Sequence, residues 1–213
     1  KKYLVGAAIG TNKEDLDRAR SLLDNGADLL VIDTAHGHSA KVLSVLSKLK
    51  KINNQITICV GNIATGEAAK KLYNSGADII KVGIGPGSIC TTRMVAGIGV
   101  PQITAIMEVK KALNKKKIRI ISDGGIKFSG DIAKALAAGA DAIMMGSIFA
   151  GTDESPGKKF KMNGKIYKQY RGMGSIGAMS SGTANTYIQK NFKDKAKFVP
   201  EGVESRVKEK GRI

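Results

Sequence analysis

Cysteine is scarce in this chain, since only Cys59 and Cys90 occur among its 213 residues. Two cysteines do not form the disulfide framework of a small secreted protein, so a reducing cytoplasm is the expected compartment. No apolar run reaches the roughly 18 residues that a membrane span needs, and the first residues lack the apolar core of a signal peptide. The sequence therefore predicts a soluble, cytoplasmic protein with no membrane partner.

Acidic residues are also few, with 18 Asp and Glu against 35 Lys and Arg and a formal net charge of +17. Such a charge could serve nucleic acid, an anionic small molecule or an acidic partner. Most lysines, however, stand where predicted helices face water, as at 48–51 and 110–117. Aromatic residues make up only 5% of the chain, which leaves few rings for stacking on bases. We interpret the charge as a solvated surface and do not expect a nucleic-acid partner.

Hydrophobic residues make up 42% of the chain and glycine occupies 26 positions, which is typical of a globular α/β protein. One pattern occurs three times: an amphipathic segment, then Gly-Ala-Asp, then a short apolar run. The glycines of this pattern are Gly26, Gly76 and Gly139. Each can adopt the left-handed conformation that ends a helix, and each apolar run suits a buried strand. The repeat therefore predicts αβ units in series.

Hydrophobic spacing predicts five helices and six strands. The expected helices are 15–25, 39–51, 65–75, 102–116 and 129–138. The expected strands are 4–8, 29–33, 56–61, 79–84, 118–122 and 142–146. Unbroken apolar strands that alternate with helices indicate a parallel sheet. Right-handed crossovers then leave either a doubly wound sheet or a closed barrel.

Polar and glycine-rich residues follow nearly every predicted strand, which favours a TIM (β/α)8 barrel, because its active site is built from the loops at the carboxyl ends of the strands. Only six of the eight strands can be counted, so we expect two βα units to precede the first residue. We expect residues 1–150 to form βα units of this barrel. We expect residues 151–213 to add a hairpin at 160–166, a nucleotide-binding loop and a mobile flap to the same domain. The reason is that a long tract without strong periodicity is usually a mobile lid or binding loop.

The segment Gly83–Arg93 is the most informative motif. Its glycines around Pro86 let the main chain approach a ligand, and Cys90 offers a thiolate nucleophile. A tight turn with a merely buried cysteine is the alternative interpretation. Cys59, by contrast, lies inside an apolar strand and is expected to pack in the core.

Two glycine signals at strand ends suggest a phosphate site. They are Ser122–Ile126, which reads Ser-Asp-Gly-Gly-Ile, and Gly146–Ser147. In TIM barrels, loops after the last strands commonly hold phosphate through main-chain N–H groups. Asp123 could then accept hydrogen bonds from ribose hydroxyls. Each glycine pair alone could be a simple turn, but together they suggest a nucleoside monophosphate.

These segments together resemble the catalytic domain of inosine-5′-monophosphate (IMP) dehydrogenase. The motifs that carry the resemblance follow the family's order over nearly the whole chain: Asp33–Ser39, Gly61–Asn62, Lys81–Arg93, Gly97–Gln102, Ser122–Ile126, Gly146–Ser147, Tyr170–Ser175 and Pro200–Val203. The resemblance implies NAD-dependent oxidation of IMP to xanthosine monophosphate, in a homotetramer. Guanosine-5′-monophosphate (GMP) reductase, or a catalytically impaired remnant that binds a nucleotide or nucleic acid, is the alternative.

The resemblance also implies roles for single residues. Cys90 would attack the purine C2 as a thiolate. The residues implied to take part in hydrolysis of the resulting thioimidate are Thr92, Glu201, Thr186 and Tyr187. The implied substrate-binding residues are Ser88, Asp123, Gly124, Gly125, Gly146, Ser147, Tyr170, Arg171, Gly172, Met173, Gly174 and Glu201. The implied NAD-binding residues are Asp33, Asn62, Gly83, Ile84 and Gly85. The carbonyl groups of Gly85, Gly87 and Cys90 would bind a potassium ion.

One position departs from the family pattern. The family's mobile flap carries an Arg-Tyr pair whose arginine is taken as the base that activates water, whereas this chain has Thr186 followed by Tyr187. An uncharged hydroxyl cannot replace a guanidinium in that role. The resemblance then implies a subsidiary route through Thr92 and Glu201, or partial substitution by Lys190.

Overall fold

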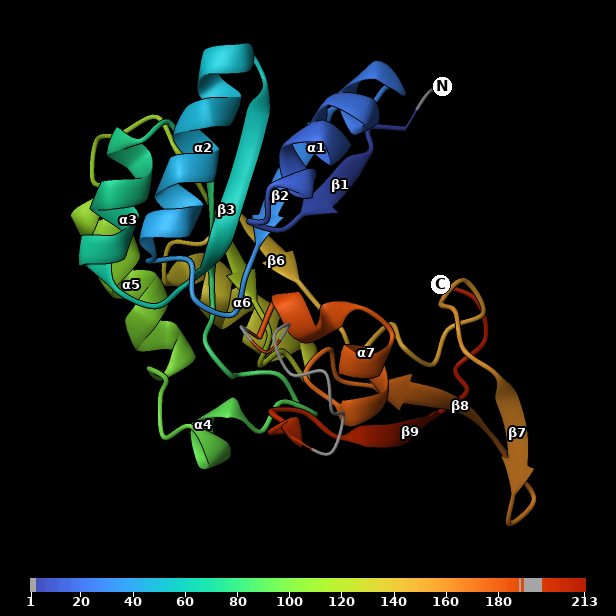
Figure 1. The fold of residues 1–213 in the computed structure, drawn as a ribbon. Coiled ribbons are helices and arrows are strands. Elements are labelled where there is room, and N and C mark those ends of the chain that lie inside the picture. Colours follow the sequence, from blue (N-terminus) through green and yellow to red (C-terminus); the bar gives the residue numbers. More distant parts are fainter. Residues whose placement is uncertain (1–2, 188, 190–196) are drawn as a thin grey trace. The chain divides into compact units, whose positions relative to one another are not determined.

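The computed structural model describes residues 3–187, 189 and 197–213. Its chain forms two compact units, the sheet unit and the loop unit. The sheet unit consists of Lys1–Ile84, Val100–Ser122 and Lys134–Ala142. The loop unit consists of Gly85–Gly99, Asp123–Ala133 and Ile143–Ile213. Figure 1 shows the elements of both.

Six strands follow one another in a single sheet in their order along the chain. They are β1 (Gly6–Ile9), β2 (Leu29–Asp33), β3 (Thr57–Ile63), β4 (Ile79–Val82), β5 (Arg119–Asp123) and β6 (Ala142–Met144). The pairs from β1 to β5 are all parallel. This sequential parallel order confirms the predicted α/β class and is that of a partial TIM barrel. All six predicted strands are present, with ends shifted by a few residues.

The predicted helices also form. They are α1 (Glu14–Asp24), α2 (Ala40–Ile52), α3 (Gly66–Asn74), α5 (Gln102–Ala112) and α6 (Ser129–Ala137). The hydroxyl groups of Ser39 and Thr65 accept hydrogen bonds from N–H groups in the first turns of α2 and α3, as N-cap residues do. Figure 1 shows α2, α3 and α5 along the outer side of the strands, where α3 packs on α5 and on β3.

The Gly-Ala-Asp repeat has a structural explanation. Its three glycines have positive φ angles, as the left-handed helix end requires. Its three aspartates make one shared contact, in which a carboxylate oxygen accepts a main-chain N–H at the start of a sheet strand. The pairs are Asp28 with Val5 at 2.8 Å, Asp78 with Ile58 at 2.8 Å, and Asp141 with Ile120 at 2.9 Å. Each repeat therefore ends one helix and ties the following turn to a strand.

The core of the sheet unit lies between the strands and the helices outside them. Its buried strand side chains include Leu30, Ile32, Ile58, Val60, Ile80, Val82 and Ile120. Its buried helix side chains include Val42, Leu46, Leu49, Leu72, Ile106 and Val109. Removal of this apolar surface from water stabilises the unit and fixes the carboxyl ends of the strands.

An antiparallel sheet organises the loop unit. Its strands are β7 (Lys159–Met162), β8 (Lys165–Arg171) and β9 (Glu204–Lys208), and its helices are α4 (Thr92–Val95), α7 (Ile176–Ser180) and the 3-10 helix η1 (Thr183–Asn185). The predicted hairpin is confirmed, with Asn163 and Gly164 at its turn. The strand β9 was not predicted. It pairs with β8 across more than 30 intervening residues, a contact that local periodicity does not reveal.

A buried lysine fastens the loop that precedes β7. The Lys168 side chain is only 2% exposed, and its ammonium group donates to the carbonyl groups of Thr152, at 2.6 Å, and Ser155. A buried charge is tolerated only with such partners. Lys168 therefore holds residues 152–155 against β8.

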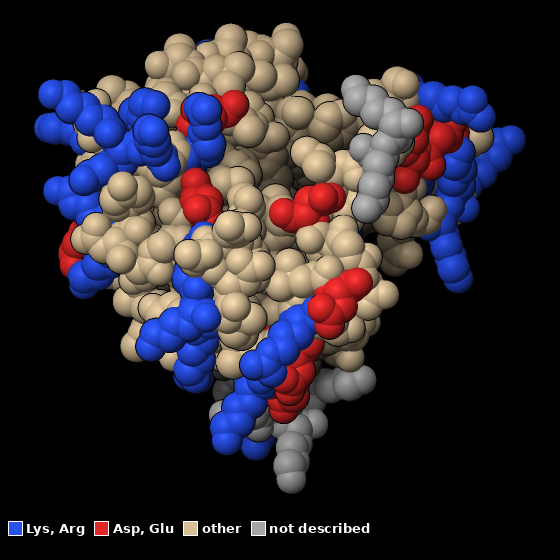
Figure 2. Space-filling model, turned by 90° about the horizontal axis from the view of Figure 1, so that it is seen from above, with Lys and Arg blue, Asp and Glu red and all other residues tan. Residues whose placement is uncertain are grey.

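Basic side chains stand in several separate groups on the face seen in Figure 2, with a few acidic side chains between them. This distribution suits a solvated surface better than one continuous polyanion site. No helix among the described residues is long and apolar enough to cross a membrane.

We expect Leu72→Ala in α3 to lower the free energy of unfolding by about 2–5 kcal/mol, because Leu72 is fully buried and the truncation leaves a cavity. The matched control is Leu136→Ala in α6, where the leucine is 44% exposed, with an expected change below about 1 kcal/mol. Urea denaturation followed by circular dichroism measures both. Equal losses in the two variants would contradict this account of the core.

Candidate active site

Cys90 lies in a tight loop that leads into α4. The N–H of Cys90 donates to the carbonyl of Gly87 at 3.1 Å, which closes the turn. The cysteine is a free thiol of intermediate burial, whereas Cys59 is 1% exposed in the core, as predicted. The Cys90 Sγ lies 3.2 Å from Thr92 Oγ1 and 3.6 Å from the main-chain oxygen of Glu201. The thiol therefore faces polar groups.

A segment more than 100 residues further along the chain pairs with this loop. Cys90 and Gly202 form an antiparallel bridge, and the N–H of Thr91 donates to the carbonyl of Glu201 at 2.9 Å. The Thr92 hydroxyl donates to Glu201 Oε2 at 2.8 Å. The structure thus aligns a thiol, a hydroxyl and a carboxylate in one hydrogen-bonded series. Sequence reasoning named all three residues, but only the fold joins them.

Glycines let a third segment, Gly172–Gly174, lie against the other two. The carbonyl of Gly174 accepts the Glu201 N–H at 3.0 Å. A Cβ atom on Gly172 would lie 3.1 Å from the Ile89 carbonyl oxygen, and one on Gly174 would lie 2.9 Å from the ring of Tyr187. Both positions therefore need glycine for close packing. Met173 and Arg171 are exposed beside them.

A small cavity of about 140 Å³ lies beside the cysteine loop within the loop unit. It is lined by Gly87, Ser88, Asp123, Gly124, Gly125, Ile126, Lys127, Met145, Gly146, Ser147 and Tyr170. Seven of these are predicted substrate-binding residues: Ser88, Asp123, Gly124, Gly125, Gly146, Ser147 and Tyr170. Glycines, hydroxyl groups and one lysine are suited to surround a phosphate. The cavity also includes Lys127, which sequence reasoning missed although it follows the glycine motif directly.

The hydroxyl of Tyr170 forms one wall of this cavity. Burial raises the pKa of Tyr170 above its ordinary value of 10.0, and a hydrogen bond with the Ser88 side chain opposes part of that rise. A Cβ atom on Gly146 would lie 2.8 Å from the Tyr170 hydroxyl. Tyr170 therefore remains a neutral hydrogen-bonding group throughout the physiological pH range.

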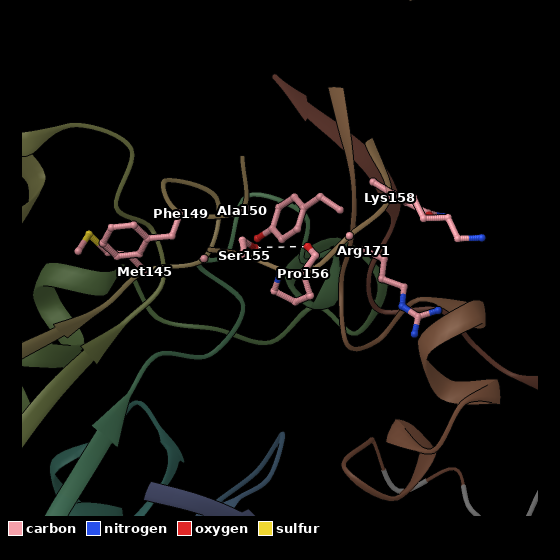
Figure 3. A pocket seen from close by; sticks show the side chains of 11 residues that line it. Met145, Phe149, Ala150, Ser155, Pro156, Lys158 and Arg171 are labelled. Carbon is pink, nitrogen blue, oxygen red and sulfur yellow. Dashed lines mark hydrogen bonds between the residues drawn. The ribbon is translucent and has the colours of Figure 1, made fainter. Parts of the chain in front are cut away.

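A larger cavity of about 660 Å³, seen in Figure 3, also has Tyr170 in its lining. Phe149 and Met145 line one end of it, and Lys158 and Arg171 stand at the other. It shares Met145, Gly146 and Tyr170 with the smaller cavity. Arg171, predicted to bind substrate, lines this larger space and not the smaller one.

Four of the predicted cofactor residues lie in the sheet unit, at the carboxyl ends of strands. Asp33 ends β2 and pairs with Lys81, with Oδ1 and Nζ 2.9 Å apart. The Asn62 amide donates to the carbonyl of Gly83 at 2.8 Å, and Ile84 follows directly. Sequence reasoning assigned no role to Lys81, although a lysine within an apolar strand was a visible signal.

Three remaining predicted positions belong to the loop unit. Gly85 has a positive φ angle, and a Cβ there would lie 2.8 Å from the Arg93 side chain. Thr186 directly follows η1, and its N–H donates to the Thr183 carbonyl at 3.0 Å. Tyr187 lies beside Gly174. Lys190 lies outside the described residues.

We expect the midpoint of Tyr170 ionisation to lie above the ordinary tyrosine value of 10.0, because burial raises its pKa. A tyrosine whose pKa is raised by folding stabilises the fold while it is protonated. This contribution is lost as the pH rises from the pKa of the unfolded chain through the pKa of the folded protein. The measurement is the absorbance of phenolate at 295 nm for the natural protein minus that of Tyr170→Phe. A difference signal that titrates below pH 10 would contradict the described burial.

Comparison with known proteins agrees with this geometry. A family model described as the IMP dehydrogenase / GMP reductase domain matches residues 1–213. Inosine-5′-monophosphate dehydrogenases are 55% identical over 209 residues in Rhizobium tropici, 54% over 210 in Aquifex aeolicus and 56% over 212 in Staphylococcus saprophyticus. These matches cover 98%, 98% and 100% of this chain. The chain spans 42–43% of the length of these relatives. On this identity over its whole length, the chain belongs to the IMP dehydrogenase / GMP reductase family.

Proposed function

We propose that this chain carries the catalytic thiol of an enzyme that oxidises IMP to xanthosine monophosphate with NAD, a step of guanine nucleotide synthesis. The observation that carries the proposal is the position of Cys90. Its thiol lies on the same short loop as Gly87 and Ser88, which line the cavity suited to phosphate. A nucleotide held there by its phosphate can present its base to the thiol.

The proposed reaction has two stages. The Cys90 thiolate adds to C2 of the purine, a carbon–sulfur bond forms, and the hydrogen on C2 leaves as hydride. Bound NAD would supply the hydride acceptor of this stage. Water then adds to C2 of the thioimidate and the carbon–sulfur bond breaks, which releases xanthosine monophosphate and restores the thiol.

The loop unit supplies the groups that orient the substrate. Ser88, Tyr170 and the glycine pair Gly124–Gly125 would surround the phosphate, and Asp123 would accept hydrogen bonds from the ribose. The main chain of Tyr170–Gly174 and the Glu201 side chain would border the base. The pairing of Glu201 with the cysteine loop supports this, because it brings the base-binding segment close to the thiol.

Asp33, Asn62 and Gly83–Gly85 would bind the dinucleotide. A potassium ion would be held by the carbonyl groups of Gly85, Gly87 and Cys90. These three carbonyl oxygens fit potassium, a hard cation that prefers oxygen ligands. The Gly87 carbonyl accepts one hydrogen bond, from the Cys90 N–H, and a carbonyl oxygen has a second lone pair for a ligand.

The hydrolytic stage would run through Thr92 and Glu201, because Thr186 is uncharged. The Thr92 hydroxyl lies 3.2 Å from Cys90 Sγ and donates to the Glu201 carboxylate. A water molecule that attacks C2 could pass its proton to Thr92 while Thr92 passes its own to Glu201. This relay needs no guanidinium, because each proton that is released has an acceptor, first Thr92 and then Glu201.

Family membership further supports a cytoplasmic homotetramer. Light scattering coupled to size exclusion measures the oligomeric state directly. Nucleic acid is not a proposed partner, because aromatic residues that could stack on bases make up only 5% of the chain.

We expect IMP and NAD together to add the mass of a purine nucleotide to Cys90, and Cys90→Ala to abolish this adduct and lower turnover at least about 10³-fold. Intact-protein mass spectrometry and NADH absorbance measure the two effects. Cys59→Ala is the matched control, because Cys59 is buried in β3, and it should leave the adduct unchanged. If GMP with NADPH is consumed and IMP with NAD is not, the protein is a reductase.

We expect Glu201→Gln to slow hydrolysis of the trapped adduct by about 10² or more, because the relay loses its proton acceptor. Rapid-quench mass spectrometry of the adduct after a single turnover measures this rate separately from hydride transfer. Glu204→Gln is the control, since Glu204 is an exposed carboxylate that accepts the Gly177 N–H. An unchanged hydrolysis rate in Glu201→Gln would exclude the relay.

A further inference from the structure

Three residues of the sheet unit lie side by side across three strands. Asp33 at the end of β2 is in register with Gly61 of β3, and Gly61 is in register with Lys81 of β4. Side chains in register on neighbouring strands of a sheet point to the same face. With strands about 4.8 Å apart, the Asp33 and Lys81 main chains are about 10 Å apart. Only a long side chain can join them.

Gly61 leaves the space through which Lys81 reaches Asp33. A Cβ atom on Gly61 would lie 2.6 Å from Lys81 Cβ and 2.7 Å from the Lys81 carbonyl oxygen, closer than atoms of a packed core approach. The Lys81 side chain is 5% exposed, and its Nζ lies 2.9 Å from Asp33 Oδ1. The lysine therefore extends across β3, over a position that has no side chain.

The two ends of this ion pair differ in exposure. The Asp33 side chain is 23% exposed, so its carboxylate is open to a ligand, while its lysine partner is sealed in the sheet. A carboxylate has about four acceptor sites on two oxygens, and one contact to Lys81 leaves capacity for further donors. A buried cation that holds a partly open carboxylate at a strand end is suited to orient that carboxylate toward a bound molecule.

A second ion pair, at the beginnings of β3 and β4, differs from the Lys81–Asp33 pair in its role. Lys50 and Asp78 are 2.7 Å apart, and the same Asp78 oxygen accepts the N–H of Ile58. Lys50 also donates to the carbonyl of Ile56. This pair ties together the beginnings of β3 and β4, so its role is explained by the fold alone.

We propose that Lys81 is a positioning residue for the dinucleotide, which acts by holding Asp33 where its carboxylate accepts hydrogen bonds from ribose hydroxyl groups. Gly61 is part of the device, because it opens the path between the two charges. The proposal rests on the proposed function, which assigns Asp33 to cofactor binding. Beyond that function, Lys81 fixes the Asp33 carboxylate and Gly61 permits the contact between them.

The test compares Lys81→Met with Lys50→Met. Isothermal titration of NAD into each protein gives the dissociation constant, and protection of Cys90 from alkylation by IMP reports the nucleotide site independently. We expect Lys81→Met to raise the NAD dissociation constant about 10- to 100-fold, the loss of one well-placed charged hydrogen bond. IMP protection should remain unchanged. Lys50→Met should lower the melting temperature and leave NAD affinity unchanged.

Two further variants at position 81 test whether the positive charge itself sets the NAD affinity. Lys81→Arg retains a cation long enough to reach Asp33 and should recover most of the lost affinity. If Lys81→Met does not fold, Lys81→Gln gives the same comparison with a polar, uncharged side chain. Wild-type NAD affinity in a folded Lys81→Met or Lys81→Gln variant would overturn the positioning role and leave the proposed function standing. Absence of NAD binding by the natural protein would overturn both.

Discussion

The pairing of Gly202 with Cys90 is the contact on which the candidate site depends. It joins two loop segments that are more than 100 residues apart, and neither belongs to a long strand. Without it, Cys90 would be a thiol on an isolated turn, with no carboxylate near it. With it, Glu201 reaches Thr92 and the glycine segment at Gly174 is bound to the same short ladder. The thiol of Cys90 and the carboxylate of Glu201 are thus brought together by this one contact between distant segments.

The two units of the chain differ in the contacts that stabilise them. The sheet unit depends on apolar side chains between strands and helices, and its polar residues are restricted to strand ends. The loop unit depends more on main-chain contacts, glycine packing and specific polar anchors such as Lys168. Such contacts define positions accurately but bury little apolar surface.

Local patterns allowed most of the sheet unit to be predicted. The Gly-Ala-Asp repeat marks helix ends through glycine geometry, and its aspartates turned out to tie strands together. The motifs also named residues that line the small cavity, including Ser88 and Asp123. What local patterns could not give are contacts between distant segments. The strand β9, the ladder of Glu201 with the cysteine loop, and Lys81 reaching over Gly61 all depend on tertiary register.

The replacement of the flap arginine by Thr186 separates the two stages of the proposed chemistry. Capture of the purine needs Cys90 and the phosphate cavity, and neither depends on the flap. Hydrolysis needs a proton acceptor near C2, for which the Thr92–Glu201 pair is in hydrogen-bond contact with the thiol loop. Under the proposed mechanism, a chain that keeps Cys90 and the phosphate cavity but lacks the flap arginine would form its adduct faster than it releases it. Hydrolysis would then limit turnover, and the covalent adduct would accumulate.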